Sequence, residues 1–170
     1  MTSTLKGFFF SILATILLIG MAAPSAYSQD AAEAREIEYG KDIFKTKATC
    51  QFCHKWDGSG DQGYGGNAPS LRKTELNPDQ VKEVVKCGRI GTGMPYHDKF
   101  AYTDKRCYGA VRDELGTDIP PIGNEYLQPR EIEAVVKYVF TKVHGRGEAT
   151  YDECTEFWGK ESRQCDQYKK

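Results

Sequence analysis

Residues 50–54, which read CQFCH, place the strongest constraint on how this chain of 170 residues can fold. Two thiols three residues apart can add to the two vinyl groups on one edge of a porphyrin. The histidine that follows then projects its imidazole under the iron. This spacing is the attachment signature of c-type haem. The sequence therefore predicts one covalently attached haem c, held by Cys50 and Cys53, with His54 as the proximal iron ligand.

A Cys-x-x-Cys pair has two other common uses, as a dithiol redox site and as half of a zinc site. A zinc site needs further ligands at close spacing, and a thioredoxin-like dithiol lies within a βαβ pattern. Neither pattern surrounds Cys50 and Cys53. The haem interpretation is therefore favoured over both alternatives.

The N-terminal segment has the layout of a secretory signal peptide. Lys6 supplies a positive charge, residues 7–23 are apolar, and Ala26 and Ser28 are small residues suited to cleavage after Ser28. We expect residues 1–28 to be removed and the mature protein to be periplasmic. The alternative is an uncleaved membrane anchor, because the apolar run is at the lower limit for spanning a bilayer.

The charge balance argues against general binding of nucleic acids or other polyanions. The chain carries 23 Lys and Arg against 24 Asp and Glu, and loss of Lys6 with the signal peptide leaves a formal charge of −2. Residues 41–106, which bracket the haem motif, sum to +4, whereas residues 29–40 and 107–170 each sum to −3. This basic segment is expected to meet an acidic patch on a partner, with an ordinary solvated mixture of charges as the alternative.

Hydrophobic periodicity predicts an all-α fold of short helices and long loops, with no strand. Helices are expected over 33–47, over 78–87 and over 129–143. Asn77 is the expected N-cap of the second helix and Gly88 its stop, while Pro129 opens the third. The third helix carries an apolar stripe of four residues: Ile132, Val135, Val136 and Val139. Three segments are expected to be non-helical: a ragged terminus at 29–32, a glycine-rich loop at 57–69 and an irregular stretch at 89–123.

Residues 33–143 resemble a monohaem class I c-type cytochrome. APSL at 68–71 is similar to the segment after the haem motif, where a proline carbonyl accepts a hydrogen bond from the proximal histidine. The resemblance assigns that role to Pro69 and ring packing to Leu71. It also implies the small helical fold of the family, with contacts between the first and last helices at these positions: Gly40 and Phe44 against Val135 and Tyr138.

CGRIGTGMPYHD, at 87–98, resembles the sixth-ligand loop of the family and assigns the axial sulfur to Met94. Met1 and Met21 would leave with the signal peptide, so Met94 would be the sole methionine of the mature chain. A thioether ligand favours ferrous iron and raises the reduction potential. Gly91 and Gly93 are expected to let the backbone turn tightly here.

Two other histidines lie beyond the haem motif. His97 is the competing candidate for the sixth ligand, and otherwise it is expected to be an exposed loop residue. His144 is expected to face solvent. Met94 itself has an alternative interpretation as a core residue.

Four cysteines remain, and an exported chain permits disulfides. Three pairings exist. The favoured one joins Cys87 to Cys107, which would close a loop around Met94, and Cys154 to Cys165, which would staple the tail. Each bridge would contribute about 3 kcal/mol through the unfolded state. Free thiols are the alternative.

The chain departs from small members of the family in its long connection after Met94, its tail and its extra cysteines. These features are similar to the cysteine-rich cytochromes that accompany quinoprotein (PQQ) methanol and alcohol dehydrogenases. We expect a haem domain over 29–144 and a C-terminal extension over 145–170.

The resemblance implies an electron carrier rather than an enzyme, working between a donor dehydrogenase and a terminal acceptor, with membrane contact only if the N-terminal segment is uncleaved. Two alternatives stay open. One is a haem c subunit of a larger membrane-associated oxidoreductase complex. The other is a haem protein with an open sixth site that binds ligands or acts as a peroxidase.

Overall fold

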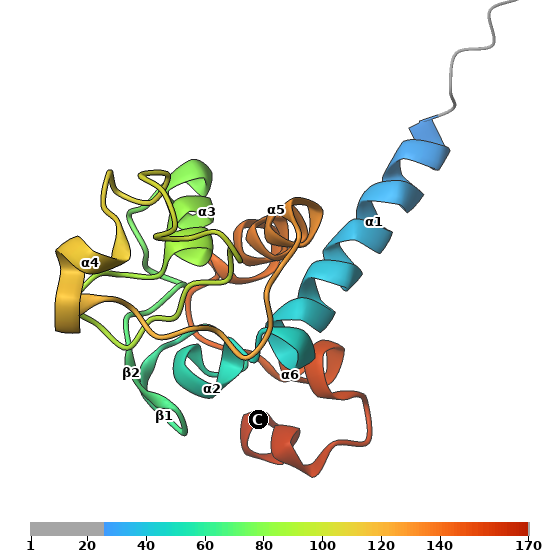
Figure 1. Cartoon of the computed structure of the whole chain (residues 1–170). Coiled ribbons are helices and arrows are strands. Elements are labelled where there is room, and N and C mark those ends of the chain that lie inside the picture. Colours follow the sequence, from blue (N-terminus) through green and yellow to red (C-terminus); the bar gives the residue numbers. More distant parts are fainter. Residues whose placement is uncertain (1–25, 170) are drawn as a thin grey trace, which may run out of the picture.

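The computed structural model describes residues 26–169, and within this range the chain is mainly helical (Figure 1). The α-helices follow one another as α1 (Ala26–Asp42), α2 (Gln51–His54), α3 (Pro78–Cys87), α4 (Arg112–Leu115), α5 (Pro129–Tyr138) and α6 (Tyr151–Trp158). π-Helical turns extend α1 at Ile43–Lys47 and α5 at Val139–Val143, and 3-10 turns lie at Gly116–Asp118 and Arg163–Tyr168. The helix-rich class predicted from periodicity agrees with this architecture.

The prediction that the chain has no strand is wrong. Strands β1 (Asp61–Gly63) and β2 (Gly66–Ala68) pair antiparallel, with Gly63 opposite Gly66, inside the segment expected to be a glycine-rich loop. Gly66 has a φ of +125°, a conformation that glycine adopts without the steric cost of a side chain. The glycines that suggested a loop therefore form a tight hairpin.

Helix α1 starts earlier than predicted. Residues 29–32, expected to be a ragged terminus, lie within the helix, and its first half projects beyond the rest of the protein (Figure 1). The predicted cleavage point after Ser28 falls in the first turn of α1. Most of the predicted signal peptide lies outside the described residues, so cleavage stays a prediction. Among the described residues, no helix combines the length and the apolar character needed to cross a membrane.

The caps predicted for the later helices are confirmed. Asn77 accepts a hydrogen bond from the Gln80 amide at 3.0 Å and α3 begins at Pro78. Gly88 ends α3 with a φ of +66°, and Pro129 opens α5. The whole predicted stripe of α5 is buried: Ile132, Val135, Val136 and Val139.

Helices α1 and α5 touch at the backbone, and Gly40 makes this approach possible. A Cβ at Gly40 would overlap the carbonyl oxygen of Ala134 and lie 2.8 Å from the Cβ of Tyr138. Phe44, one turn further along, packs on Tyr138 with ring centroids 5.6 Å apart. The contact expected at Tyr138 is confirmed. The partner of Gly40 in the preceding turn is Ala134, with Val135 buried beside it in the same core.

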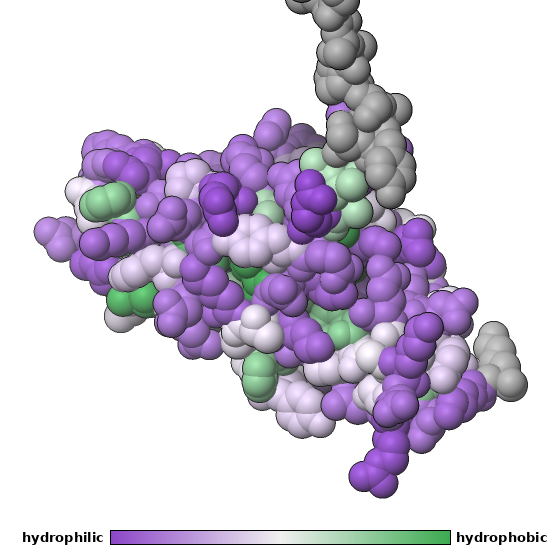
Figure 2. All heavy atoms as spheres, turned by 90° about the vertical axis from the view of Figure 1, so that its right-hand side faces the viewer, coloured by the Kyte–Doolittle hydropathy of each residue, from purple (hydrophilic) through white to green (hydrophobic). Residues whose placement is uncertain are grey.

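The C-terminal extension packs onto this core. Phe157 of α6 is 4 % exposed, and its ring lies 6.4 Å from that of Phe44. The Cys154–Cys165 disulfide ties α6 to the last 3-10 turn, which confirms the pairing predicted for the tail. Hydrophilic residues cover most of the face shown in Figure 2, with only scattered hydrophobic residues between them.

A buried carboxylate joins α1, the turn after it and the start of α5. Glu131 accepts hydrogen bonds from the Tyr39 hydroxyl at 2.8 Å, the Lys47 ammonium at 2.6 Å and the Gln128 amide at 2.8 Å. Burial by itself would raise the pKa of Glu131, but the three hydrogen bonds outweigh it and lower the pKa to about 2.

We predict that Gly40→Ala destabilises the fold by about 2–3 kcal/mol, because the added methyl group pushes apart two helix backbones that cannot yield locally. This loss exceeds the gain of about 1 kcal/mol that alanine normally brings to a helix interior. Urea unfolding of the purified protein measures the difference. Gly93→Ala is the matched control, since a Cβ there meets nothing within 4 Å. Equal stability of the two variants would contradict the close crossing.

The ionisation of Glu131 gives a second prediction, for acid stability. The folded pKa of about 2 lies below the ordinary value of 4.5, so the stabilisation is present above pH 4.5 and is lost as pH falls toward 2. Between pH 7 and pH 3 the protein should lose about 2 kcal/mol through this group. Glu131→Gln should remove that part of the loss in urea unfolding at the two pH values. Glu133→Gln, at an exposed neighbouring carboxylate, should leave the loss unchanged.

Candidate functional site

The predicted attachment residues lie on one helical turn. The His54 amide donates to the Cys50 carbonyl at 2.9 Å, which closes α2 and places Cys50, Cys53 and His54 together. Both cysteines carry free thiols, in contrast to the four that form disulfides.

The β1–β2 hairpin lies directly against this turn. The Gly65 amide donates to the Phe52 carbonyl at 2.9 Å, and a Cβ on Gly65 would come within 2.7 Å of the Cys53 sulfur. A Cβ on Gly63 would overlap the Phe52 carbonyl oxygen. Sequence reasoning missed this role of the two glycines. The available signal was the run of glycines at 63, 65 and 66, because glycine in and beside a tight turn marks a place where another backbone approaches closely.

His54 is buried and its ring is oriented by Pro69. Nδ1 lies 3.0 Å from the Pro69 carbonyl oxygen, which can only accept a hydrogen bond, so Nδ1 carries the proton. Nε2 is then the unprotonated nitrogen, which is the form that binds a metal. Burial lowers the pKa of His54, and the bond to Pro69 only partly offsets this, so the neutral imidazole is favoured. Leu71 is half-buried and packs on the main core.

Met94 lies in a separate segment, the turn that follows α3. Its carbonyl accepts from the Arg89 amide at 3.2 Å, and its amide donates to the Thr92 hydroxyl at 3.2 Å. Gly91 has a φ of +71°, in the left-handed region as expected, whereas Gly93 is not in that region. The half-buried Met94 therefore lies in a tight turn. Of the two glycines expected to form this turn, only Gly91 adopts a left-handed conformation.

The two remaining histidines differ from expectation. His97 is 2 % exposed, not an exposed loop residue: its Nδ1 donates to the Glu125 carbonyl at 2.8 Å. Burial lowers the pKa of His97. His144 is half-buried rather than solvent-facing, because its Nε2 lies 3.1 Å from the Thr74 carbonyl and its ring packs on Phe140. The His144 ring joins the end of the π-helical turn after α5 to the loop at Thr74, and the His97 ring joins two loops; no local sequence pattern reveals these contacts.

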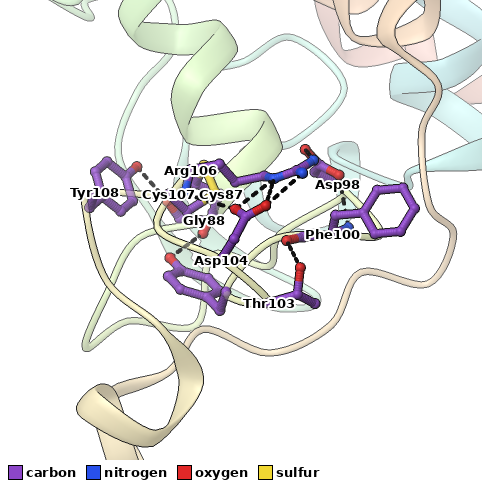
Figure 3. The surroundings of a disulfide bond; sticks show 10 residues. Cys87, Gly88, Asp98, Phe100, Thr103, Asp104, Arg106, Cys107 and Tyr108 are labelled. Atoms are coloured by element: carbon purple, nitrogen blue, oxygen red, sulfur yellow. Dashed lines mark hydrogen bonds and ion pairs between the residues drawn. A yellow bond between two sulfur atoms is a disulfide. The ribbon is translucent and has the colours of Figure 1, made fainter.

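The Cys87–Cys107 disulfide, predicted from the sequence, closes the loop that contains Met94 (Figure 3). Both cysteines are buried in a second core with Tyr96, Ala101 and Tyr102. The Tyr102 hydroxyl donates to the Cys87 carbonyl at 2.6 Å, and the Tyr108 hydroxyl donates to the Gly88 carbonyl at 2.8 Å. Desolvation raises the pKa of Tyr102 to about 12, so its hydroxyl stays a donor. The end of α3 and the start of the Met94 turn are therefore held by both the disulfide and the two tyrosines.

An exposed cluster covers the outside of this disulfide. Figure 3 shows Asp104 and Arg106 paired beside it, with a bond of 2.7 Å between Nη2 and Oδ2. The Arg106 guanidinium also lies 5.2 Å from the centre of the Phe100 ring. These contacts give the long stretch after Met94 a defined structure, and α4 is a short helix within the segment predicted to be irregular.

The arrangement around α2 fits a covalently bound haem. Two free thiols and an imidazole with an unprotonated Nε2 share one turn, which is the donor set that haem c requires. Gly65 leaves room beside the Cys53 sulfur where a side chain would crowd it. Cys50, Cys53 and His54 would hold the group.

The fold and the site are consistent with a c-type cytochrome domain. Residues 35–112 match the family model described as "Cytochrome C oxidase, cbb3-type, subunit III", a range that contains the haem motif, Pro69, Met94 and the Cys87–Cys107 bridge. Searches of curated proteins and of solved structures found no match.

The family match supports a c-type cytochrome with one covalently bound haem c. Domains of this kind transfer electrons through the haem, interact with redox partner proteins and typically lie outside the cytoplasm. The dithiol and zinc interpretations of residues 50–54 are accordingly set aside.

Proposed function

We propose that this protein is a periplasmic electron carrier whose single haem iron is held by His54 and Met94. It would accept electrons from a quinoprotein methanol or alcohol dehydrogenase and pass them to a terminal acceptor. The observation that carries the proposal is the orientation of His54, whose Nδ1 is bound to the Pro69 carbonyl at 3.0 Å while Nε2 is left for the iron. When bound, haem supplies an iron that cycles between Fe(II) and Fe(III).

Met94 is the sixth ligand in this proposal because its turn is firmly held. The Gly91 amide donates to the Asp118 carbonyl at 2.7 Å, which ties the turn to the 3-10 turn at Gly116–Asp118. His97 is the competing candidate, since its Nδ1 bond to the Glu125 carbonyl likewise leaves Nε2 unprotonated, and the spectra of Met94→Ala and His97→Gln decide between the two residues. A ligand in a restrained turn needs little reorganisation when the iron changes its charge, and this suits rapid electron transfer.

Electron transfer, rather than chemistry on a bound substrate, follows from two protein ligands on one iron. With both axial positions taken, a substrate has no open position to bind. The residues of this chain would then orient the ring through Cys50 and Cys53 and exclude water through the apolar core. Partner proteins would approach the edge of the site.

A second candidate is a haem c subunit of a larger oxidoreductase complex, and the family match favours it because that family is named for an oxidase subunit. Several large hydrophobic side chains are exposed, and a fixed neighbour could cover them. These residues are Phe52, Tyr64, Ile90, Phe100, Tyr108, Ile122 and Tyr126. Such a subunit would use the same two ligands.

We predict that Met94→Ala abolishes the weak far-red band that methionine ligation produces in the oxidised protein. The iron should become partly high-spin and bind carbon monoxide, because the sulfur no longer occupies the sixth position. Visible spectra of both oxidation states measure this. His97→Gln is the control and should keep the far-red band. An unchanged spectrum in Met94→Ala would contradict the ligand assignment, and carbon monoxide binding by the wild type would favour the open-site alternative.

The two candidate functions predict different sizes in the native state. A soluble carrier should elute from gel filtration of gently prepared periplasmic extract at the size of a small single chain. A fixed subunit should elute with a larger complex and should leave it only when detergent or high salt is applied. Haem staining of the fractions reports the position of the protein. Co-elution with other chains would exclude the free carrier.

A further inference from the structure

We propose that Arg72 is a positioning residue for the proximal ligand, and that through it the C-terminal extension, residues 145–170, controls the hydrogen bond on His54. The inference rests on the proposed function only in taking His54 as the proximal ligand. Neither the haem motif nor the family match, which ends at residue 112, involves the extension.

The Arg72 guanidinium is buried, and all three of its nitrogens donate hydrogen bonds within the protein. The side chain is 5 % exposed. Nη1 donates to the Asp57 carbonyl at 2.9 Å, Nε to the Gly147 carbonyl at 2.5 Å and Nη2 to the Glu148 carbonyl at 3.2 Å. Nη2 also pairs with the Glu153 carboxylate at 3.1 Å. A buried charge with this many directed partners tolerates only one arrangement of the segments that supply them.

Arg72 closes the loop that carries Pro69. This loop starts at Asp57, whose carbonyl Arg72 binds, and the Arg72 and Leu71 amides both donate to the Gly58 carbonyl, at 3.3 and 2.8 Å. Pro69 lies three residues before Arg72. The position of Arg72 therefore fixes where the Pro69 carbonyl lies.

The same loop is fastened to His54 at its other side. The Gly60 amide donates to the His54 carbonyl at 3.0 Å, and a Cβ on Gly60 would lie 2.7 Å from the Pro69 carbonyl oxygen. The loop thus holds His54 at its backbone through Gly60 and at its ring through Pro69. A shift of the loop would alter the Nδ1–O distance of 3.0 Å directly.

The extension holds Arg72 from outside the loop. The Gly145 amide donates to the Arg72 carbonyl at 3.0 Å, so the extension is hydrogen-bonded to both the backbone and the side chain of Arg72. Glu153 is itself fixed, because it accepts from the Thr150 amide at 3.1 Å and from Arg146 Nε at 3.2 Å. Its neighbour Cys154 is locked to Cys165. The extension is therefore a rigid support for Arg72.

This support affects the iron through the basicity of the imidazole. A hydrogen bond from Nδ1 to a carbonyl oxygen makes Nε2 a stronger donor, which stabilises Fe(III) and lowers the reduction potential. If Arg72 no longer holds the loop, the bond weakens, the potential rises and the Nδ1 proton exchanges with solvent more readily.

The test uses Arg72→Lys in the haem-loaded full-length protein, because lysine keeps the charge but cannot reach four acceptors at once. We expect a higher midpoint potential by spectroelectrochemistry. By NMR of the reduced, diamagnetic protein, the His54 Nδ1 proton should exchange about tenfold faster, as for one weakened hydrogen bond. Arg163→Lys, which makes the same change at an exposed arginine elsewhere in the extension, should leave both quantities unchanged.

A milder pair of variants keeps the proposal testable if Arg72→Lys folds poorly. Glu153→Gln removes the ion pair while leaving the carbonyl bonds of Arg72, and it should also speed the exchange of the Nδ1 proton. Glu148→Gln removes an equal charge at an exposed side chain and should not. A lower melting temperature with unchanged potential and exchange in Arg72→Lys would overturn the proposal.

Failure of the proposed function would appear in a different measurement from failure of the Arg72 proposal. Loss of the Met94 assignment appears in the spectra of Met94→Ala, whereas the Arg72 measurements need only the His54 Nδ1 resonance of the wild type. If that resonance is absent from the loaded protein, His54 is not the proximal ligand and both proposals fall together. If it is present and insensitive to Arg72, only the positioning role falls.

Discussion

The backbone contact between α1 and α5 at Gly40 is the constraint on which the rest of the structure depends. It brings Phe44 onto Tyr138 and buries the apolar stripe of α5. The haem motif starts only a few residues after this crossing, and the Asn124 amide group donates to the Thr49 hydroxyl at 2.8 Å just before it. The crossing therefore positions the start of the haem motif. The hydrogen bond from Lys47 to Glu131 stabilises this crossing.

Two independent supports surround the site that this crossing positions. Around His54, hydrogen bonds within residues 54–72 orient the imidazole, and Arg72 in this segment pairs with Glu153 of the C-terminal extension. Around Met94, the turn is held by the Cys87–Cys107 disulfide and by tyrosine hydroxyls that donate to the Cys87 and Gly88 carbonyls. A bridge closing a loop of this length contributes about 3 kcal/mol, so restraint of the loop that contains Met94 does not rely on the main core.

The elements that could be predicted are those with a local physical cause. Asn77, Pro78 and Gly88 define α3 because cap chemistry acts over a few residues. The cysteine pairing followed from proximity in the chain. The hairpin was missed because Gly63 and Gly65 signal a turn without saying what it packs against. His97 and His144 were placed in solvent because their acceptors, Glu125 and Thr74, lie 28 and 70 residues away in the chain.

The sequence by itself determined the chemistry of this protein: one haem attachment turn, a methionine in a glycine loop and two local disulfides. These are short-range patterns in which residue type and spacing carry the physical meaning. Only the tertiary structure decided how that chemistry is supported. The bond between His54 Nδ1 and the Pro69 carbonyl, which the resemblance implied, spans 15 residues, whereas the Arg72–Glu153 pair, which nothing in the sequence indicated, spans 81. Such contacts depend on where distant segments meet, because burial and hydrogen bonding are satisfied in space rather than along the chain.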